Sequence, residues 1–200
     1  MTRDVRLLFG PLAAAILLVG VAALPLLIPG YSSVRQTVSE IGEMTSPARL
    51  PFAAMLCAVA ACILVFAAGL RALSLQNGRS AAASYVSGCM AVSAAGVGIF
   101  AFPHPLHNVF GLSELVGYQA PLVLALTWPR DPEARAAVSF SWIMTAVVWL
   151  AILANLSSLF RDAVIWPHLK PIYGLMQRAL FASWFVWCAG LGVMLYRRPT

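Results

Sequence analysis

Residues 51–70 read PFAAMLCAVAACILVFAAGL, twenty consecutive residues without a charged side chain. A helix of that length extends about 30 Å, which matches the hydrocarbon thickness of a lipid bilayer. Lipid offers no hydrogen-bond partner to free backbone N–H and C=O groups, so a segment that crosses it must be helical. The stretch therefore predicts a transmembrane helix.

Five further runs of similar length and character occur along the chain. The sequence shows no series of short alternating segments of the kind that is typical of outer-membrane barrels. We therefore predict an all-α fold, a polytopic membrane protein built as a six-transmembrane-helix bundle, in a single domain over residues 1–200. The predicted spans are residues 7–28, 51–70, 82–102, 112–128, 136–156 and 173–196.

The composition agrees with lipid as the main solvent. Hydrophobic residues make up 61% of the chain and charged residues only 10%, whereas about a quarter of the residues in a soluble domain are charged. The formal net charge of +6 could indicate nucleic acid, but the Lys and Arg residues are scattered between apolar runs and form no basic stripe. We expect membrane lipid as a partner and no nucleic acid.

The four cysteines lie inside the apolar runs. They are Cys57, Cys62, Cys89 and Cys188, and none forms a C-x-x-C pair. A disulfide framework would place them in loops of an oxidising compartment. We interpret them as buried apolar residues.

Positive charge sets the expected orientation, because cytoplasmic loops of membrane proteins are enriched in Lys and Arg. With six spans, both termini and the loops after the second and fourth spans share one side, which holds eight of the thirteen Lys and Arg residues. We expect that side to be cytoplasmic, in the cell (inner) membrane, with the first, third and fifth loops outside. A cleaved signal peptide is the alternative interpretation of the first run.

Two spans carry features that affect helix packing. The third is rich in small residues, with Ser84 and Gly88, and Ala94 and Gly98, each four apart. Such spacing lets helix backbones approach closely in lipid, so this span is our candidate for the centre of the bundle. Pro121 in the fourth span lacks a backbone donor and predicts a kink there.

Titratable side chains gather on the predicted outer side. All three histidines lie there, in loop three (residues 103–111, PHPLHNVFG) and loop five (residues 157–172, SSLFRDAVIWPHLKPI). Ionisable groups at membrane depth are costly and usually face the bundle interior or a wet cavity. The clustering predicts a polar site at the outer face.

Glu114 and Arg178 each lie just inside a predicted span. Glu114 and Tyr118 are one helical turn apart and share a face, and Gln177 precedes Arg178 at the start of the last span. An ion pair between Glu114 and Arg178 would lower the cost of keeping both there. The alternatives are an Arg178 side chain that extends to the interface and a Glu114 that is exposed in the first turn of its helix.

Metal and nucleophile chemistry have weaker support. His104, His107 and His168 are the candidate metal ligands, but Pro103 and Pro105 flank His104 and favour an extended loop rather than a helix around the first two, and no H-E-x-x-H motif occurs. We assign no metal, and the cofactor is unknown. No G-x-S-x-G motif surrounds a serine. We expect Ser39 to cap a short helix, or Gly42 to permit a left-handed turn, in loop one (residues 30–49).

Three short segments stand out along the chain: Ser39-Glu40-Ile41-Gly42 before Pro47, Phe102-Pro103 followed by His107, and Gly174-Leu175-Met176-Gln177-Arg178. Together with the six-span layout, they resemble an uncharacterised bacterial and archaeal membrane family, domain of unknown function 998, over nearly the whole chain. A eukaryotic six-span family linked to lipid-anchor remodelling and autophagy is also similar, with a Ser-Asp-x-Gly element where this chain has Glu40. The resemblance implies that Ser39, Glu40, Gly42, His107, Gln177 and Arg178 form one site.

We expect a polar pocket at the outer face that binds a lipid or another amphiphile. The expected ligand-binding residues are Ser39, Glu40, His107, Glu114, Tyr118, Gln177 and Arg178, with Arg178 binding an anionic headgroup through its planar fork. One alternative is a membrane-embedded lipid hydrolase or transferase, with His107, Glu40 and Glu114 as candidate catalytic residues and with or without a metal. Another is a structural or assembly partner without a ligand. The sequence leaves a homo-oligomer open.

Overall fold

The computed structural model describes residues 4–129 and 132–197, and in this part of the chain the secondary structure is helical with no strand. Six helical stretches are long and apolar enough to cross a membrane. The predicted all-α bundle with six spans is therefore confirmed. The stretches are Val5–Leu27, Arg49–Gln76, Ala82–Ile99, Pro105–Thr127, Arg135–Leu159 and Trp166–Tyr196.

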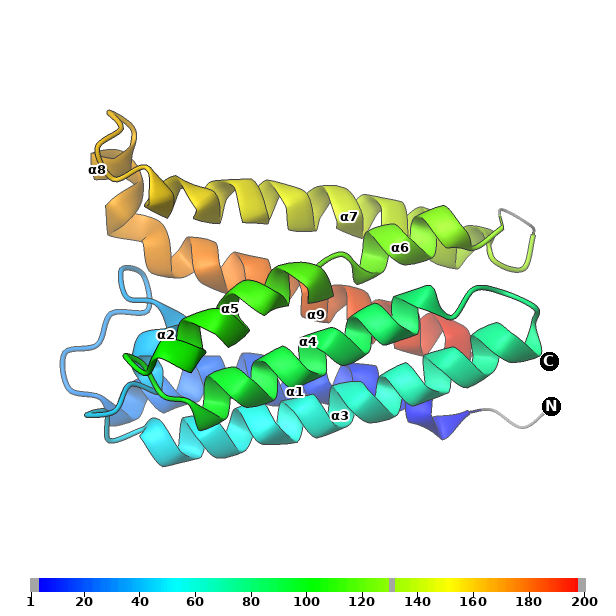
Figure 1. Cartoon of the computed structure of the whole chain (residues 1–200), viewed down its shortest axis with the longest axis horizontal. Helices are drawn as coiled ribbons and strands as arrows, with labels where there is room; N and C mark the ends of the chain where they lie inside the picture. Colours follow the sequence, from blue (N-terminus) through cyan, green and yellow to red (C-terminus); the bar gives the residue numbers. More distant parts are fainter. Residues whose placement is uncertain (1–3, 130–131, 198–200) are drawn as a thin grey trace.

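The helices run side by side along the long axis of the molecule (Figure 1). Their bounds are η1 (Val5–Leu8), α1 (Phe9–Ala23), η2 (Leu24–Leu27), α2 (Val38–Ile41), α3 (Arg49–Gln76), α4 (Ala82–Ile99), α5 (Pro105–Gly117), α6 (Ala120–Thr127), α7 (Arg135–Leu156), η3 (Ser157–Leu159), α8 (Trp166–Leu169), η4 (Lys170–Ile172) and α9 (Tyr173–Tyr196).

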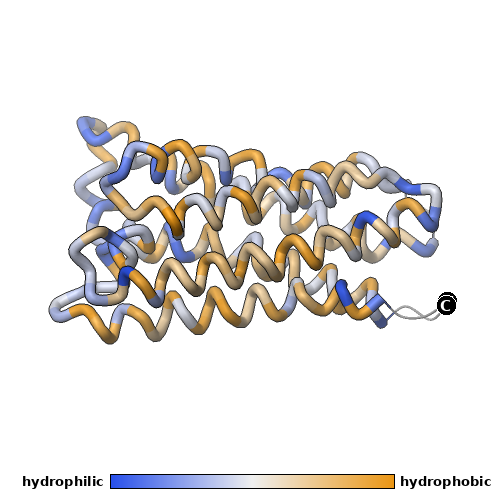
Figure 2. Tube along the Cα trace, turned by 60° about the horizontal axis from the view of Figure 1, so that its bottom comes forward, coloured by the Kyte–Doolittle hydropathy of each residue, from blue (hydrophilic) through white to orange (hydrophobic). Residues whose placement is uncertain are grey.

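The two ends of the bundle differ. The helix η1 and the C-terminal end of α9 lie at one end of the bundle, which we call the proximal end (Figure 1). The other end, here the distal end, is formed by residues 28–48, 100–104 and 157–172 (Figure 1), which include nearly all of the predicted outer loops one and five and the first two residues of loop three. Hydrophilic residues concentrate at both ends and hydrophobic ones between them, as expected for a bundle in a bilayer (Figure 2).

Loop three differs most from the sequence-based expectation. Residues 103–111 were expected to form an extended loop, but α5 begins at Pro105 and includes most of this segment. His104 is extended, as its proline neighbour predicts, and its side chain accepts a hydrogen bond from the Leu106 backbone N–H at 3.2 Å. Pro105 then occupies the first turn, where a missing N–H costs nothing. The same proline that extends His104 thus starts the helix that carries His107.

The fourth span is interrupted near Pro121, as predicted. α5 ends at Gly117 and α6 begins at Ala120, so the break directly precedes the proline. Pro121 has no N–H to donate to the Gly117 carbonyl, four residues earlier. The indole Nε1 of Trp184, on α9, donates to that carbonyl at 2.9 Å instead.

The small residues of α4 permit close helix packing at some positions but not at all of them. α4 packs against α3, α5 and α6. A methyl group on Gly96 would overlap the Phe110 ring, and one on Gly98 would lie 2.9 Å from Leu56 Cβ. Gly88 has open space around it. The Ala94–Gly98 pair therefore supports close packing, whereas the expected Ser84–Gly88 pair does not.

The largest fully buried side chains include the indoles of α9. Trp184 and Trp187 have no exposed surface, and Phe66 of α3 meets Trp187 edge to face at 6.4 Å between ring centroids. α9 packs against both α1 and α7. The centre of the bundle thus involves α9 at least as much as α4.

All four cysteines are free thiols, and only two are buried. Cys62 and Cys188 lie in the core, whereas Cys57 and Cys89 are exposed on the flanks of α3 and α4. The expectation that all four are buried in protein is wrong for these two. An apolar thiol on a membrane span has lipid as its solvent, so the apolar runs did not predict burial in protein.

Candidate functional site

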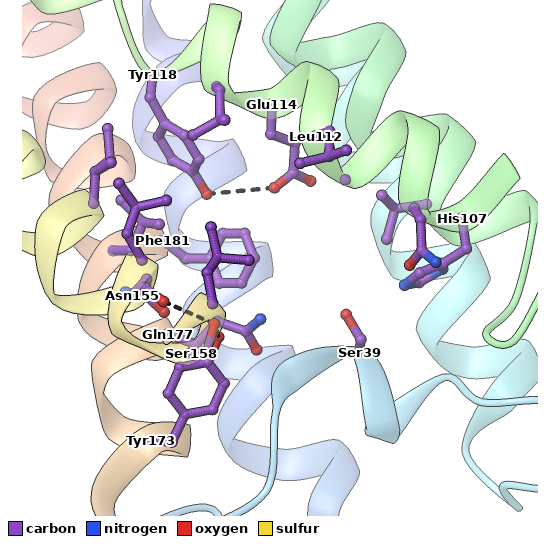
Figure 3. A pocket seen from close by; sticks show the side chains of 18 residues that line it. Ser39, His107, Leu112, Glu114, Tyr118, Asn155, Ser158, Tyr173, Gln177 and Phe181 are labelled. Carbon is purple, nitrogen blue, oxygen red and sulfur yellow. Dashed lines mark hydrogen bonds between the residues drawn. The ribbon is translucent and has the colours of Figure 1, made fainter. Parts of the chain in front are cut away.

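A pocket of about 540 Å³ lies toward the distal end, between α5 on one side and α7 and α9 on the other (Figure 3). α5 packs chiefly on α4, while α7 and α9 pack on each other, and this arrangement leaves the space between them. The lining residues are Ser39, Val97, His107, Asn108, Gly111, Leu112, Glu114, Leu115, Tyr118, Ile152, Asn155, Leu156, Ser158, Leu159, Tyr173, Gln177, Leu180 and Phe181.

One face of α5 forms a wall of the pocket. His107, Gly111, Glu114 and Tyr118 are spaced by four, three and four residues, which places them along one helical stripe. All four line the pocket. The helical start at Pro105 is what brings His107 into register with Glu114, because an extended loop would not have aligned them.

Glu114 is buried, with only 9% of its surface exposed. The Tyr118 hydroxyl donates to its Oε2 at 3.4 Å, and its Oε1 has no hydrogen-bond partner among the described residues. Because α5 begins nine residues earlier, Glu114 lies in the third turn. The alternative of an exposed first-turn carboxylate is therefore wrong.

The expected ion pair between Glu114 and Arg178 does not form. Arg178 lies on α9, and its guanidinium donates from Nη1 to the carbonyls of Gln36 and Gly174, each at 2.9 Å, and from Nη2 to the Tyr31 hydroxyl at 2.8 Å. Arg178 is not among the residues that line the pocket. Its side chain therefore binds loop one to the last span.

Loop one lies directly on the first turns of α9. A methyl group on Gly174 would overlap the Gln36 carbonyl oxygen and would lie 2.7 Å from that of Ser33. The Leu175 backbone N–H also donates to the Val34 carbonyl at 3.2 Å. Only glycine permits this approach, so the segment 174–178 serves as the docking surface for loop one.

Tyr31 completes this junction. Its hydroxyl donates to the Thr37 carbonyl at 2.6 Å, and its ring centroid lies 5.7 Å from the Arg178 guanidinium. Burial raises the pKa of Tyr31 above its usual value of about 10, and the hydrogen bond and charge of Arg178 oppose that rise in part. Tyr31 is therefore neutral in the folded chain at physiological pH.

Gln177 connects the junction to the pocket. Its Oε1 accepts a hydrogen bond from the Val38 backbone N–H, and the side chain also lines the pocket. The adjacent Ser39 is held at the pocket wall and appears there in Figure 3. Of the residues that the resemblance groups together, the structure places Ser39, His107 and Gln177 on one pocket.

Glu40 has a structural role in loop one. Its Oε1 accepts from the backbone N–H and the hydroxyl of Thr37, both at 2.9 Å, and its Oε2 accepts from Gln36 Nε2 at 2.9 Å. These contacts form a capping box in which Thr37 caps α2. Ser39 is thus not the cap that the sequence suggested. Glu40 does not line the pocket.

Gly42 is not in a left-handed conformation, because its φ is −103°. A methyl group at Gly42 would overlap the ring of Phe52, so a close approach rather than a turn requires glycine there. The two backbone explanations proposed for Ser39 and Gly42 are therefore both wrong, although the segment does form a short helix.

His107 is buried and has a defined orientation. Its Nδ1 lies 2.8 Å from the Phe100 carbonyl oxygen, which can only accept, so Nδ1 carries a hydrogen. Its Nε2 has no partner in the described part of the chain and is left for the pocket. A histidine held in this way offers an acceptor when neutral and a donor when protonated.

The three histidines do not converge. His104 caps α5 at an exposed position, His107 lines the pocket, and His168 lies on α8 in loop five. Within residues 4–129 and 132–197, no three His, Cys, Asp or Glu side chains are grouped so that they could hold a metal ion.

The structure adds polar residues that the sequence reasoning missed. Asn155 of α7 and Tyr173 of α9 line the pocket. Asn155 Nδ2 donates to the carbonyls of Ala151 and Met176, and Tyr173 donates to Ser158 Oγ at 3.0 Å. An amide inside an otherwise apolar span, and a tyrosine one turn before Gln177, were the signals that could have identified them.

Residues 11–194 match the model of a protein family described as "Protein of unknown function (DUF998)". No curated protein matches the chain, and no solved structure does.

Proposed function

The chain belongs to this family of unknown function, DUF998, as a multi-pass membrane protein, and we propose that its distal pocket binds a lipid or another amphiphile. The observation that carries the proposal is one polar stripe of α5, with a buried carboxylate, that faces a pocket between membrane-spanning helices. A volume of about 540 Å³ lies within the range of small-molecule sites.

The two parts of the pocket suit the two parts of an amphiphile. Its polar groups include those of Ser39, His107, Glu114, Asn155 and Gln177. Its lining includes Leu112 and Leu115, which are 68% and 38% exposed and lie on the membrane-spanning stretch Pro105–Thr127, where an exposed side chain can face lipid. A ligand could therefore keep its chain among leucines while its headgroup reaches the polar wall.

The sidedness is part of the proposal. The sequence has an excess of Lys and Arg in the terminal segments and in the loops after the second and fourth spans, and this excess favours a cytoplasmic location for both termini in the cell (inner) membrane, so that the distal pocket lies near the outer leaflet. Single cysteines at Ser33 and Asn77, in a background without the native thiols, would report this directly. An impermeant maleimide applied to intact cells should label position 33 and not position 77, and the opposite pattern would reverse the sidedness.

Two glycines provide a matched test of binding. Gly111 lines the pocket and Gly88 does not, yet both are helical and both have open space around an added Cβ. Gly111→Trp should fill the pocket, whereas Gly88→Trp should project into lipid. We expect native mass spectrometry of the purified protein to show co-purified amphiphile on the wild type and on Gly88→Trp, and much less on Gly111→Trp. Equal occupancy on all three would contradict the proposal.

A catalytic role is the second candidate, favoured by the orientation of His107. A carbonyl fixes one ring nitrogen and leaves the other at the pocket, which is the arrangement that a general base requires. His107→Ala should then abolish turnover of a bound lipid without loss of folding. If the wild-type protein binds its ligand and leaves it chemically unchanged, the catalytic role is contradicted and the binding function remains.

A further inference from the structure

The pocket has one carboxylate and no fixed positive charge. Glu114 is its acidic group, and no Lys or Arg lines it in the described part of the chain. His107 is the other ionisable side chain besides the tyrosines Tyr118 and Tyr173. Because Arg178 is directed into loop one, the expected cation for an anionic headgroup is missing from this space.

Glu114 needs a partner that the protein does not supply. One of its oxygens receives a long hydrogen bond from Tyr118, and the other has none among the described residues. A buried carboxylate without a counter-charge is strongly destabilising in its ionised form. A cationic ligand in the pocket would provide both the charge and the donors.

Two further side chains of the pocket offer a hydrogen-bond acceptor. Asn155 gives both of its recorded hydrogen bonds from Nδ2, so its Oδ1 remains for the pocket. His107 uses Nδ1 as a donor, so a neutral ring offers Nε2 as an acceptor. Gln177 accepts through Oε1 and therefore offers Nε2 as a donor. Together with the Glu114 oxygens, Asn155 Oδ1 and His107 Nε2 give the pocket three side chains that can accept from a group that only donates.

Aromatic rings border the same space. Tyr118 and Phe181 line the pocket with their ring centroids 6.4 Å apart, and Tyr173 lines it from the start of α9. Ring faces attract cations, most strongly where water is excluded. The rings therefore favour the same charge as the carboxylate.

We propose that the pocket takes an amphiphile with an ammonium headgroup, with Glu114 as its counter-ion and Asn155 and His107 as further acceptors. This inference rests on the proposed function and specifies its ligand class. It replaces the expectation of an anionic headgroup at Arg178, since that side chain is engaged in binding loop one.

The test uses three ligands with one alkyl chain: dodecylamine, dodecanol and laurate. They carry an ammonium, a neutral hydroxyl and a carboxylate at neutral pH. Binding to the purified full chain in detergent micelles is measured by native mass spectrometry, with Gly111→Trp as the blocked control. We expect dodecylamine to bind about tenfold more tightly than dodecanol, since hydrogen bonds to charged groups exceed neutral ones by roughly that factor. Laurate should bind more weakly still.

Glu114→Gln should remove the preference for the amine and leave dodecanol binding unchanged. Glu43→Gln is the matched control, because it removes a carboxylate from loop one that does not line the pocket. If Glu114→Gln fails to fold, the relative affinities of the wild type for dodecylamine, dodecanol and laurate still test the preference for an ammonium headgroup.

The outcomes separate the two proposals. Binding of laurate or dodecanol as tight as that of the amine, blocked by Gly111→Trp, overturns the ammonium inference and keeps an amphiphile site. Binding of all three ligands that Gly111→Trp leaves unchanged overturns the proposed function itself.

Discussion

The indole Nε1 of Trp184 lies 2.9 Å from the carbonyl oxygen of Gly117, the acceptor that Pro121 leaves without its helical donor. A tryptophan on the sixth span thus satisfies the backbone of the fourth at its break. In lipid an unsatisfied carbonyl has no water to replace the lost bond. The kink and the indole therefore form one structural unit.

Trp184→Phe should destabilise the protein by roughly 1–3 kcal/mol, because it leaves the Gly117 carbonyl without a partner. Pro121→Ala restores a backbone donor four residues after Gly117. The double variant should therefore lose less stability than the sum of the two single variants, with a coupling of about 0.5 kcal/mol or more. Thermal unfolding in detergent measures all four proteins, and strict additivity would show that the indole does not compensate for the proline.

Arg178→Lys should loosen loop one, because an ammonium cannot reproduce the three bonds to Gln36, Gly174 and Tyr31. We expect a loss of stability on the order of 2 kcal/mol. Trypsin cleavage at the exposed Arg35 should become faster, which is a local readout. Arg35→Gln in the same background is the control, since it removes the cleavage site. Unchanged cleavage at Arg35 would contradict the docking role.

Tyr31→Phe should lower stability by about 1 kcal/mol at neutral pH, since it removes the hydroxyl between Thr37 and Arg178. The pH dependence has a definite sign. Because the pKa of Tyr31 is raised by burial, the unfolded chain ionises first as the pH passes about 10, and the wild type loses stability there. The phenylalanine variant lacks this loss. The difference in unfolding free energy between the wild type and Tyr31→Phe, measured as a function of pH, should therefore become smaller above pH 10. A stability difference that grows above pH 10 would contradict the raised pKa of Tyr31.

Gly96→Ala should destabilise the α4–α5 contact by roughly 1–3 kcal/mol, because its Cβ would overlap the Phe110 ring. Gly88→Ala, on the same helix with open space around it, is the control. Alanine favours helix over glycine by about 1 kcal/mol, so the control should be neutral or slightly stabilised. Equal effects at the two positions would mean that the close approach at Gly96 is not important for stability.

The length and composition of the apolar runs were sufficient to predict the bundle but not the polar contacts within it. Long apolar runs can satisfy their backbone in lipid only as helices, so the six spans followed from composition. The prediction of an extended loop three was wrong because its two prolines were interpreted as a sign of irregular structure. Pro105 instead begins α5, and this helix aligns His107 with Glu114.

The pocket could be predicted in part. Ser39, His107, Glu114, Tyr118 and Gln177 were expected at one site and do line one pocket. The roles of Arg178 and Glu40 could not be read from the sequence, because a charged side chain near a span looks the same whether it faces a ligand or binds backbone atoms of a distant loop. Gln36 and Arg178, for example, are 142 residues apart.

That separation has a consequence for biogenesis. The ribosome synthesises loop one well before Gly174. Residues 31–41 therefore have no partner surface until the intervening spans have been inserted and α9 has been synthesised. In a nascent chain that lacks α9, the Gln36 carbonyl has no Arg178 to bind, and the pocket lacks the residues that α9 contributes. The contacts that hold loop one can therefore form only after the last helix has been synthesised.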